Sequence, residues 1–154
     1  MSRIIKDSGW SRDLKNLQKG GEVTVGIHES DANRGDGPTN ALIGFWQEFG
    51  THKNGRRHIP PRSFLQSTAS NNEREHRKVL NYAIKKSLGG YLTLKQAFAI
   101  LGLKVSSDIK ETIRAQIPPP LADSTIRKKK SSTPLIDTGQ LINSIDYEVS
   151  KNVV

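Results

Sequence analysis

Two short stretches of the chain alternate apolar and polar residues with a period of two. They cover residues 22–29 and 142–149. Their apolar positions are Val23, Val25, Ile27, Ile145, Tyr147 and Val149. This alternation is typical of a strand with one buried face, because successive side chains of a strand point to opposite sides. The pattern therefore predicts two half-buried strands.

Between these strands, apolar residues recur at steps of three and four, which predicts helices. The clearest stripe covers residues 93–117, and three consecutive prolines end it. Gly102 lies inside this helix, where close packing against a neighbour is one reason to keep a glycine. Residues 63–88 predict a second long helix, whose apolar stripe is interrupted by the polar segment 71–78. A helix with a polar middle either projects into solvent or lies against a polar partner.

Shorter helices are predicted over residues 4–17, 40–49 and 122–130. Asp137 can cap one further helical turn that continues through Leu141. The helix over 40–49 has Thr39 or Asn40 as its expected cap. Its expected apolar side consists of Ala41, Leu42, Phe45, Trp46 and Phe49. The stretch 30–39 is dense in Gly, Asp, Asn and Pro, so it predicts a loop.

Helices framed by two strands predict an α+β fold, with a small antiparallel β-sheet packed with several helices, one or two of them long. The length of 154 residues favours a single domain over 1–154. Residues 1–20 are expected to add an N-terminal helix whose packing the pattern leaves open.

The stretch 48–65 connects the helix over 40–49 to the long helix that follows. Gly50 can end the first helix, because glycine adopts conformations that other residues resist. Residues 51–58 contain no apolar side chain, which predicts a solvated basic loop. Pro60 and Pro61 fix two φ angles and hold the chain extended before the next helix. We therefore expect a stiff hinge that displays basic residues.

Charge and composition narrow the function classes. The net charge of +9 favours polyanions or acidic protein surfaces as neighbours. A hydrophobic share of 34% fits a chain that completes its burial in an assembly. The absence of cysteine excludes disulfides and thiolate chemistry. The sequence contains no signal peptide and no apolar run near the ~18 residues that a membrane span needs, so we expect a chain that is cytosolic when made and that contacts no membrane.

No catalytic constellation emerges from the motifs, since the chain lacks a G-x-S-x-G elbow, an H-E-x-x-H pair and a Walker loop. A metal site made by His52, His58 and Glu48 is conceivable, but solvated loop histidines are the favoured interpretation. Glu48 and Asp137 could form a carboxylate pair, yet nothing in the sequence brings them together. We predict no catalytic residue, no metal and no cofactor.

Basic clusters leave one alternative function open. They lie at residues 56–57, 74–78, 85–86 and 127–130. Nucleic-acid binding requires such clusters on one face, ideally with interleaved aromatic residues. The clusters show no aromatic interleaving along the chain. Solvated faces or acidic protein partners are therefore favoured, and a basic nucleic-acid-binding module is the alternative.

Two separated segments carry a resemblance to a known family. The first contains EFGT at 48–51 and IPPRSFL at 59–65. The second contains PPL at 119–121, TI at 125–126, a lysine at 128, PLIDTGQL at 134–141 and a closing strand. In this order they resemble the tailed-phage virion-morphogenesis family, known as tail-completion, minor tail or neck proteins. Many members have proline after the arginine of the first motif. This chain has Ser63 there, which is expected to loosen the helix start slightly.

The resemblance implies a structural and non-enzymatic role in the virion. Such proteins lie near the head–tail junction, often as rings, and complete the tail or join it to the connector. The implied partners are further copies of the chain, tail tube or terminator proteins and head–tail connector proteins, with a possible contact to DNA in the channel. A protomer that contacts the next one head to tail closes into a ring when the rotation closes.

The motif residues are candidates for the core or for contacts between subunits. Phe64, Leu65, Leu135, Leu141 and Ile145 are expected as apolar anchors, and Arg62 can pair with Glu48 within or between protomers. The basic stretch before Pro60 is the best candidate for a contact with a neighbouring subunit, a partner ring or DNA. The complete candidate set is Glu48, Phe49, Gly50, Arg56, Arg57, His58, Pro60, Pro61, Arg62, Phe64, Leu65, Leu135, Asp137, Thr138, Gly139 and Leu141.

Overall fold

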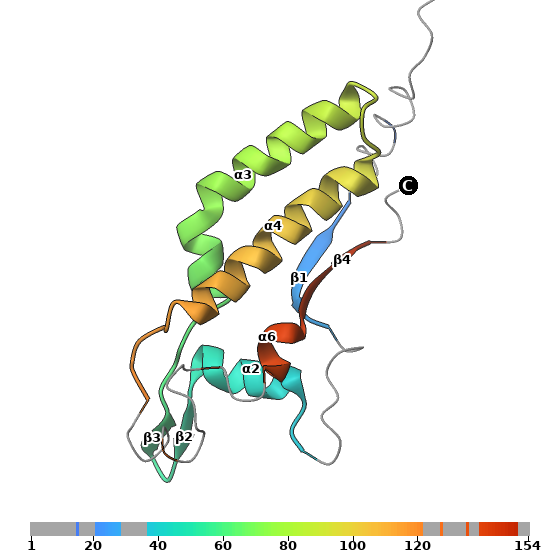
Figure 1. The fold of residues 1–154 in the computed structure, drawn as a ribbon. Helices are drawn as coiled ribbons and strands as arrows, with labels where there is room; N and C mark the ends of the chain where they lie inside the picture. Colours follow the sequence, from blue (N-terminus) through green and yellow to red (C-terminus); the bar gives the residue numbers. More distant parts are fainter. Residues whose placement is uncertain are drawn as a thin grey trace, which may run out of the picture.

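A helical hairpin forms the long axis of the molecule in the computed structural model, which describes residues 15, 21–28, 37–121, 127, 135 and 139–150 (Figure 1). Helix α3 (Gln66–Leu88) and helix α4 (Leu94–Arg114) lie side by side and are joined by a short turn. The prediction of two long helices is confirmed. Helix α3 begins at Gln66 rather than at 63, because residues 60–65 form an irregular approach that bends at Phe64 and Leu65.

A two-stranded antiparallel sheet packs against α4. It consists of β1 (Val23–Ile27) and β4 (Ile145–Val149), with Val25 opposite Tyr147. Helix α4 approaches the sheet closely at Gly102, since a Cβ atom there would lie 2.5 Å from the ring of Tyr147. The close packing predicted for Gly102 is confirmed, and its partner is a strand.

Short elements gather at the end of the molecule away from the α3–α4 turn (Figure 1). They are α2 (Asn40–Phe49), β2 (Thr51–Lys53), β3 (Arg56–Ile59) and α6 (Gln140–Asn143). Helix α2 starts as predicted, with the Thr39 hydroxyl accepting a hydrogen bond from the Leu42 N–H at 3.2 Å. Helix α6 runs through Asn143, so β4 begins at Ile145 and not at the predicted 142. These elements and the sheet give the predicted α+β fold.

The hydrophobic core joins the segment just before α3 with α4, α6 and β4. Its buried members are Phe64, Ile109, Ile113, Leu135, Leu141, Ile142 and Ile145. Phe64, Ile113 and Ile145 are fully buried, so the residue just before α3 is as central as the helices. In the part of the chain that the structure describes, no helix is long and apolar enough to cross a membrane.

Several predicted elements fall outside the described residues. The helices over 4–17 and 122–130 and most of the loop over 30–39 belong to this group. Asp137 and Thr138 also lie outside the described residues, as do the side chains of Arg56 and Arg57.

Candidate functional site

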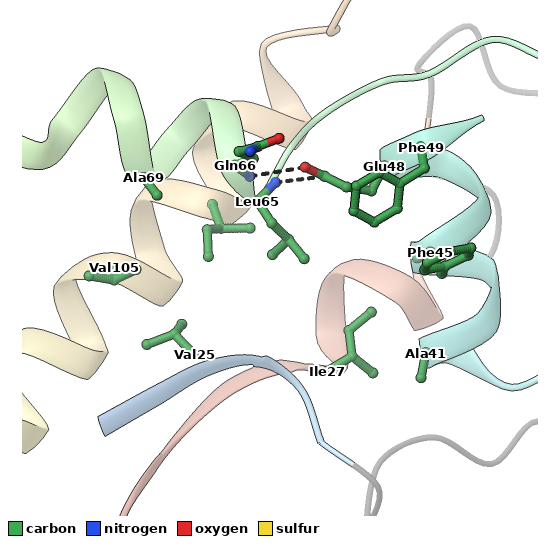
Figure 2. Close-up of a pocket in the computed structure, with 12 residues that line it drawn as sticks. Val25, Ile27, Ala41, Phe45, Glu48, Phe49, Leu65, Gln66, Ala69 and Val105 are labelled. Carbon is green, nitrogen blue, oxygen red and sulfur yellow. Dashed lines mark hydrogen bonds between the residues drawn. The ribbon is translucent and has the colours of Figure 1, made fainter. Parts of the chain in front are cut away.

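Glu48, in the last turn of α2, organises the start of α3 through its carboxylate. The side chain is only 5% exposed. Its Oε2 accepts hydrogen bonds from the N–H groups of Phe64 at 2.8 Å and Leu65 at 3.0 Å. Its Oε1 accepts a third from the Gln66 N–H at 3.0 Å (Figure 2). The first N–H groups of a helix have no partner within the helix, so an acid sixteen residues upstream performs the role of a cap.

Ser63 strengthens this contact instead of loosening the helix start. Its hydroxyl donates to Glu48 Oε1 at 2.6 Å and accepts from the Ser67 N–H at 3.2 Å. A proline at this position would supply neither interaction, because it has no hydroxyl group. The expectation that Ser63 loosens the start of α3 was therefore wrong in this fold.

Arg62 ties the same segment to the second motif. It is 4% exposed, and its Nε donates to the Pro119 carbonyl at 2.9 Å, with a longer bond of 3.4 Å from Nη2 to Pro120. Burial lowers the pKa of Arg62 below its ordinary value. The guanidinium stays charged, since the ordinary pKa of arginine is far above neutrality. The backbone N–H of Arg62 also donates to the Gln47 carbonyl, which fixes the approach to α3 against α2.

Glu48 and Arg62 therefore do not form an ion pair within the protomer, which was one of the two arrangements that the sequence analysis considered. The carboxylate binds the start of α3, and the guanidinium binds carbonyls after α4. We call the set Glu48, Arg62, Ser63, Pro119 and Pro120 the motif junction. It brings together residues from both resemblance segments, which are more than fifty positions apart.

Apolar residues of the two segments meet directly beneath the motif junction. Phe64 is fully buried in one cluster with Leu135, Leu141 and Ile145. Leu65 packs against this cluster and is partly buried. The expectation of apolar anchors is confirmed for the core of the protomer.

Gly50 and Gly139 adopt the conformations that the sequence analysis expected of glycine. Gly50 has a φ of 74°, and a Cβ there would lie 2.7 Å from the Ile59 carbonyl oxygen. Gly139 has a φ of 79° and holds the N-cap position of α6, where the sequence analysis had placed Asp137. Pro60 is partly buried and Pro61 is exposed.

The predicted loop over 51–58 is instead a β-hairpin, which carries Arg56, Arg57 and His58 on β3. Its turn consists of Asn54 and Gly55, with φ values of 52° and 73°. Positive φ at both central residues is the geometry that Asn-Gly favours in hairpin turns. The Asn-Gly pair was the available signal, but the flanking segments lack the apolar alternation that usually accompanies it. The predicted solvation is confirmed for His52, Lys53 and His58, which are exposed, whereas Thr51 is half-buried.

The expected apolar side of α2 is largely exposed. Ala41, Leu42, Phe45 and Phe49 are exposed, and Trp46 is half-buried. The helix buries Asn40, Gly44 and Glu48 instead, because Glu48 must reach the start of α3. Phe45 and Phe49 remain 58% and 61% exposed, with ring centroids 4.9 Å apart. Because the Glu48 side of α2 points inward, the side that carries Phe45 and Phe49 points outward.

That face forms one wall of an apolar groove of about 580 Å³ (Figure 2). The other walls come from β1, the start of α3 and the middle of α4. Its apolar lining residues are Val25, Ile27, Ala41, Phe45, Phe49, Leu65, Ala69, Val105 and Ile109. Large exposed apolar surfaces in soluble proteins mark contact sites, so this groove is the candidate assembly surface.

A buried polar cluster holds the middle of the helical hairpin. Asp108 of α4 is 6% exposed and accepts from His76 Nε2 at 2.8 Å and from Lys104 Nζ at 2.6 Å. Burial raises the pKa of Asp108, but the hydrogen bonds from Lys104 and His76 together outweigh it and lower the pKa. The polar segment of α3 therefore lies partly against a polar partner, which was one of the two predicted alternatives.

Among the residues that the structure describes, no three His, Cys, Asp or Glu side chains are placed to hold a metal ion together. No protein-family model, curated protein or solved structure matches this chain.

Proposed function

We propose that this chain is a structural virion protein of a tailed phage that acts in tail completion or head–tail joining, as a ring at the neck. The motif junction carries the proposal. The two segments of the resemblance are one physical unit in the folded protomer, because Arg62 of the first donates to the carbonyls of Pro119 and Pro120 in the second. A shared order of motifs is better evidence of common ancestry when the motifs depend on one another physically.

The apolar groove supports an assembling role. Phe45 and Phe49 present aromatic surface that the protomer itself leaves more than half exposed. Aromatic residues at the centre of protein interfaces contribute much of the binding energy. We propose that a different surface of the next copy fills this groove. Such a head-to-tail contact generates a closed ring when the rotation between neighbours closes.

The experiment compares phage particles made with and without the protein. We expect native mass spectrometry of the purified protein with tails or connectors to show a ring bound to one of them. We expect electron microscopy to show unjoined heads and tails when the protein is absent, and joining after it is added back. A protein that binds neither component, and whose loss leaves particles joined and infectious, would refute the proposed function.

A further inference from the structure

The turn between α3 and α4, which lies at the end of the molecule opposite the β2–β3 hairpin, is strongly basic (Figure 1). Between Glu75 and Asp108 the chain contains no acidic residue. The same interval contains Arg77, Lys78, Lys85, Lys86, Lys95 and Lys104. One half of the helical hairpin therefore combines many cations with no carboxylate of its own.

These cations fall into two groups according to their partners. Arg77 binds Glu73, Lys78 binds Glu75, and Lys104 binds Asp108. Lys85, Lys86 and Lys95 form no ion pair with any carboxylate that the structure describes. We call these three lysines the tip lysines. No carboxylate of the described residues neutralises their charge, so among these residues they attract anions more strongly than the paired cations do.

Two exposed tyrosines flank one of the tip lysines. The Lys86 ammonium lies 5.5 Å from the ring centroid of Tyr82 and 5.0 Å from that of Tyr91. The two rings are 61% and 77% exposed. Tyr91 is held in place because its N–H donates to the Lys86 carbonyl at 3.0 Å across the turn. The turn thus fixes a cation between two aromatic rings whose remaining surface is open to solvent.

We propose that the tip lysines and these two tyrosines bind the phosphodiester backbone of nucleic acid, with the tyrosine rings stacking on unpaired bases where a single strand is present. Lysines that contact phosphates supply the sequence-independent part of nucleic-acid binding. Aromatic rings beside a basic surface supply stacking platforms for bases. An acidic protein surface would satisfy the lysines but would make no comparable use of two exposed rings.

This surface differs from the one that the sequence suggested. Along the chain, Tyr82 lies three positions before the basic cluster at 85–86, and Tyr91 lies five positions after it. The turn at Gly89 and Gly90 brings both rings to Lys86. The proposal goes beyond virion assembly and is independent of it, because a protein that assembles without contacting DNA would contradict only this inference.

The test is a salt titration of binding to a labelled DNA duplex and to one of its strands. The variant Lys85→Gln/Lys86→Gln/Lys95→Gln removes the tip lysines. The control Lys53→Gln/Arg56→Gln/Arg57→Gln removes three charges from the β2–β3 hairpin, which is the competing DNA contact that the sequence analysis considered. We expect the tip variant to lower the slope of log affinity against log salt by about three units and the control by less than about one. Thermal unfolding of each variant confirms that it is folded.

A third variant, Tyr82→Leu/Tyr91→Leu, tests the stacking. We expect it to weaken binding of the single strand several-fold and to leave the duplex nearly unchanged. Three results would overturn the proposal. One is no binding of either DNA by the natural protein at about 50 mM salt, where phosphate contacts are strong. Another is an equal change in the salt slope for the tip variant and for the control variant in the β2–β3 hairpin. The last is a tip variant that loses binding of polyglutamate but binds DNA as the natural protein does.

Discussion

The motif junction and the helical hairpin both place charged side chains inside the fold, but with different consequences. At the junction, Glu48 and Arg62 are almost fully buried and bind backbone groups of segments far away in the sequence. In the hairpin, Asp108 is the buried acid, and its partners His76 and Lys104 are side chains of the two helices. Loss of a junction side chain removes the partner of backbone groups at the start of α3 or after α4, of which the Phe64 N–H is buried. The helical hairpin can lose an ion and keep its backbone hydrogen bonds.

The difference teaches where the architecture depends on single residues. The helical hairpin is stabilised by apolar stripes and by its own backbone hydrogen bonds, so its polar side-chain contacts contribute less to its stability. The junction lacks regular backbone hydrogen bonding of its own. Residues 60–65 form neither helix nor strand, and they are held by contacts with α2 and with the segment after α4. We therefore expect the largest effects of substitution at the junction.

The largest expected effect is that of Glu48→Ala. The substitution leaves the N–H groups of Phe64, Leu65 and Gln66 without their acceptor, and buried donors without partners are costly. We expect the free energy of unfolding in urea to fall by about 3 kcal/mol. The matched control is Glu111→Ala, an exposed acid of α4, with a change within about 0.5 kcal/mol. Similar values for the two variants would contradict the assigned role of Glu48.

A smaller loss is expected for Arg62→Met. Methionine keeps much of the side-chain volume but cannot donate to the Pro119 and Pro120 carbonyls. Hydrogen bonds from a charged donor contribute more than neutral ones, so we expect a loss of about 2 kcal/mol in urea unfolding. Arg114→Met, at an exposed position of α4, serves as the control. If both arginine variants are equally stable, Arg62 does not connect the two segments.

Asp108→Asn should cost less, about 1 kcal/mol near neutral pH, because the amide can still accept hydrogen bonds. The lowered pKa of Asp108 means that its contribution is present above the unfolded pKa of about 4 and is lost as pH falls through the folded value. Stability measured against pH should therefore fall less steeply below about pH 4 in the variant than in the natural protein. If the stability of Asp108→Asn and that of the natural protein fall equally steeply at acid pH, Asp108 does not contribute to the pH dependence of stability.

The smallest effect is expected for Arg77→Ala on the exposed side of α3. Arg77 and its partner Glu73 have side chains that are 70% and 67% exposed. Exposed ion pairs contribute little, so the free energy of unfolding should change by less than about 0.5 kcal/mol. A loss of stability as large as that of Arg62→Met would show that the exposed polar contacts of the helical hairpin contribute as much to stability as the motif junction does.

The sequence predicted those parts of the fold that depend on periodic burial. The alternation that includes Val25 and Ile145 predicted the strands, and the stripe through Ile109 and Ile113 predicted α4. These predictions succeeded because the apolar residues of each element face the core at regular intervals. The outward position of Phe45 and Phe49 could not be predicted. It follows from the demand that Glu48 face inward, which depends on a partner sixteen residues away. Amphipathic periodicity identifies the apolar face of a helix and does not say whether the protomer covers it.

The same limit applies to the candidate surfaces. Arg62 and Glu48 stood out in the sequence as motif residues, but their separate partners become visible only when Pro119 folds back onto the approach to α3. The Asn54-Gly55 turn is a different case. Its signal is local, because positive φ at both positions depends on those two residues, although the sequence analysis expected a loop there.

The central claim is that the motif junction maintains the protomer while the apolar groove joins it to its neighbours. The most direct measurement is attachment to phage tails or connectors by the folded variant Phe45→Ser/Phe49→Ser. Its control is Leu42→Ser/Leu103→Ser, which removes exposed apolar side chains outside the groove. We predict that the groove variant unfolds at nearly the same urea concentration as the natural protein but forms no ring and does not attach, while the control does both. A folded groove variant that forms rings and attaches normally would contradict the account.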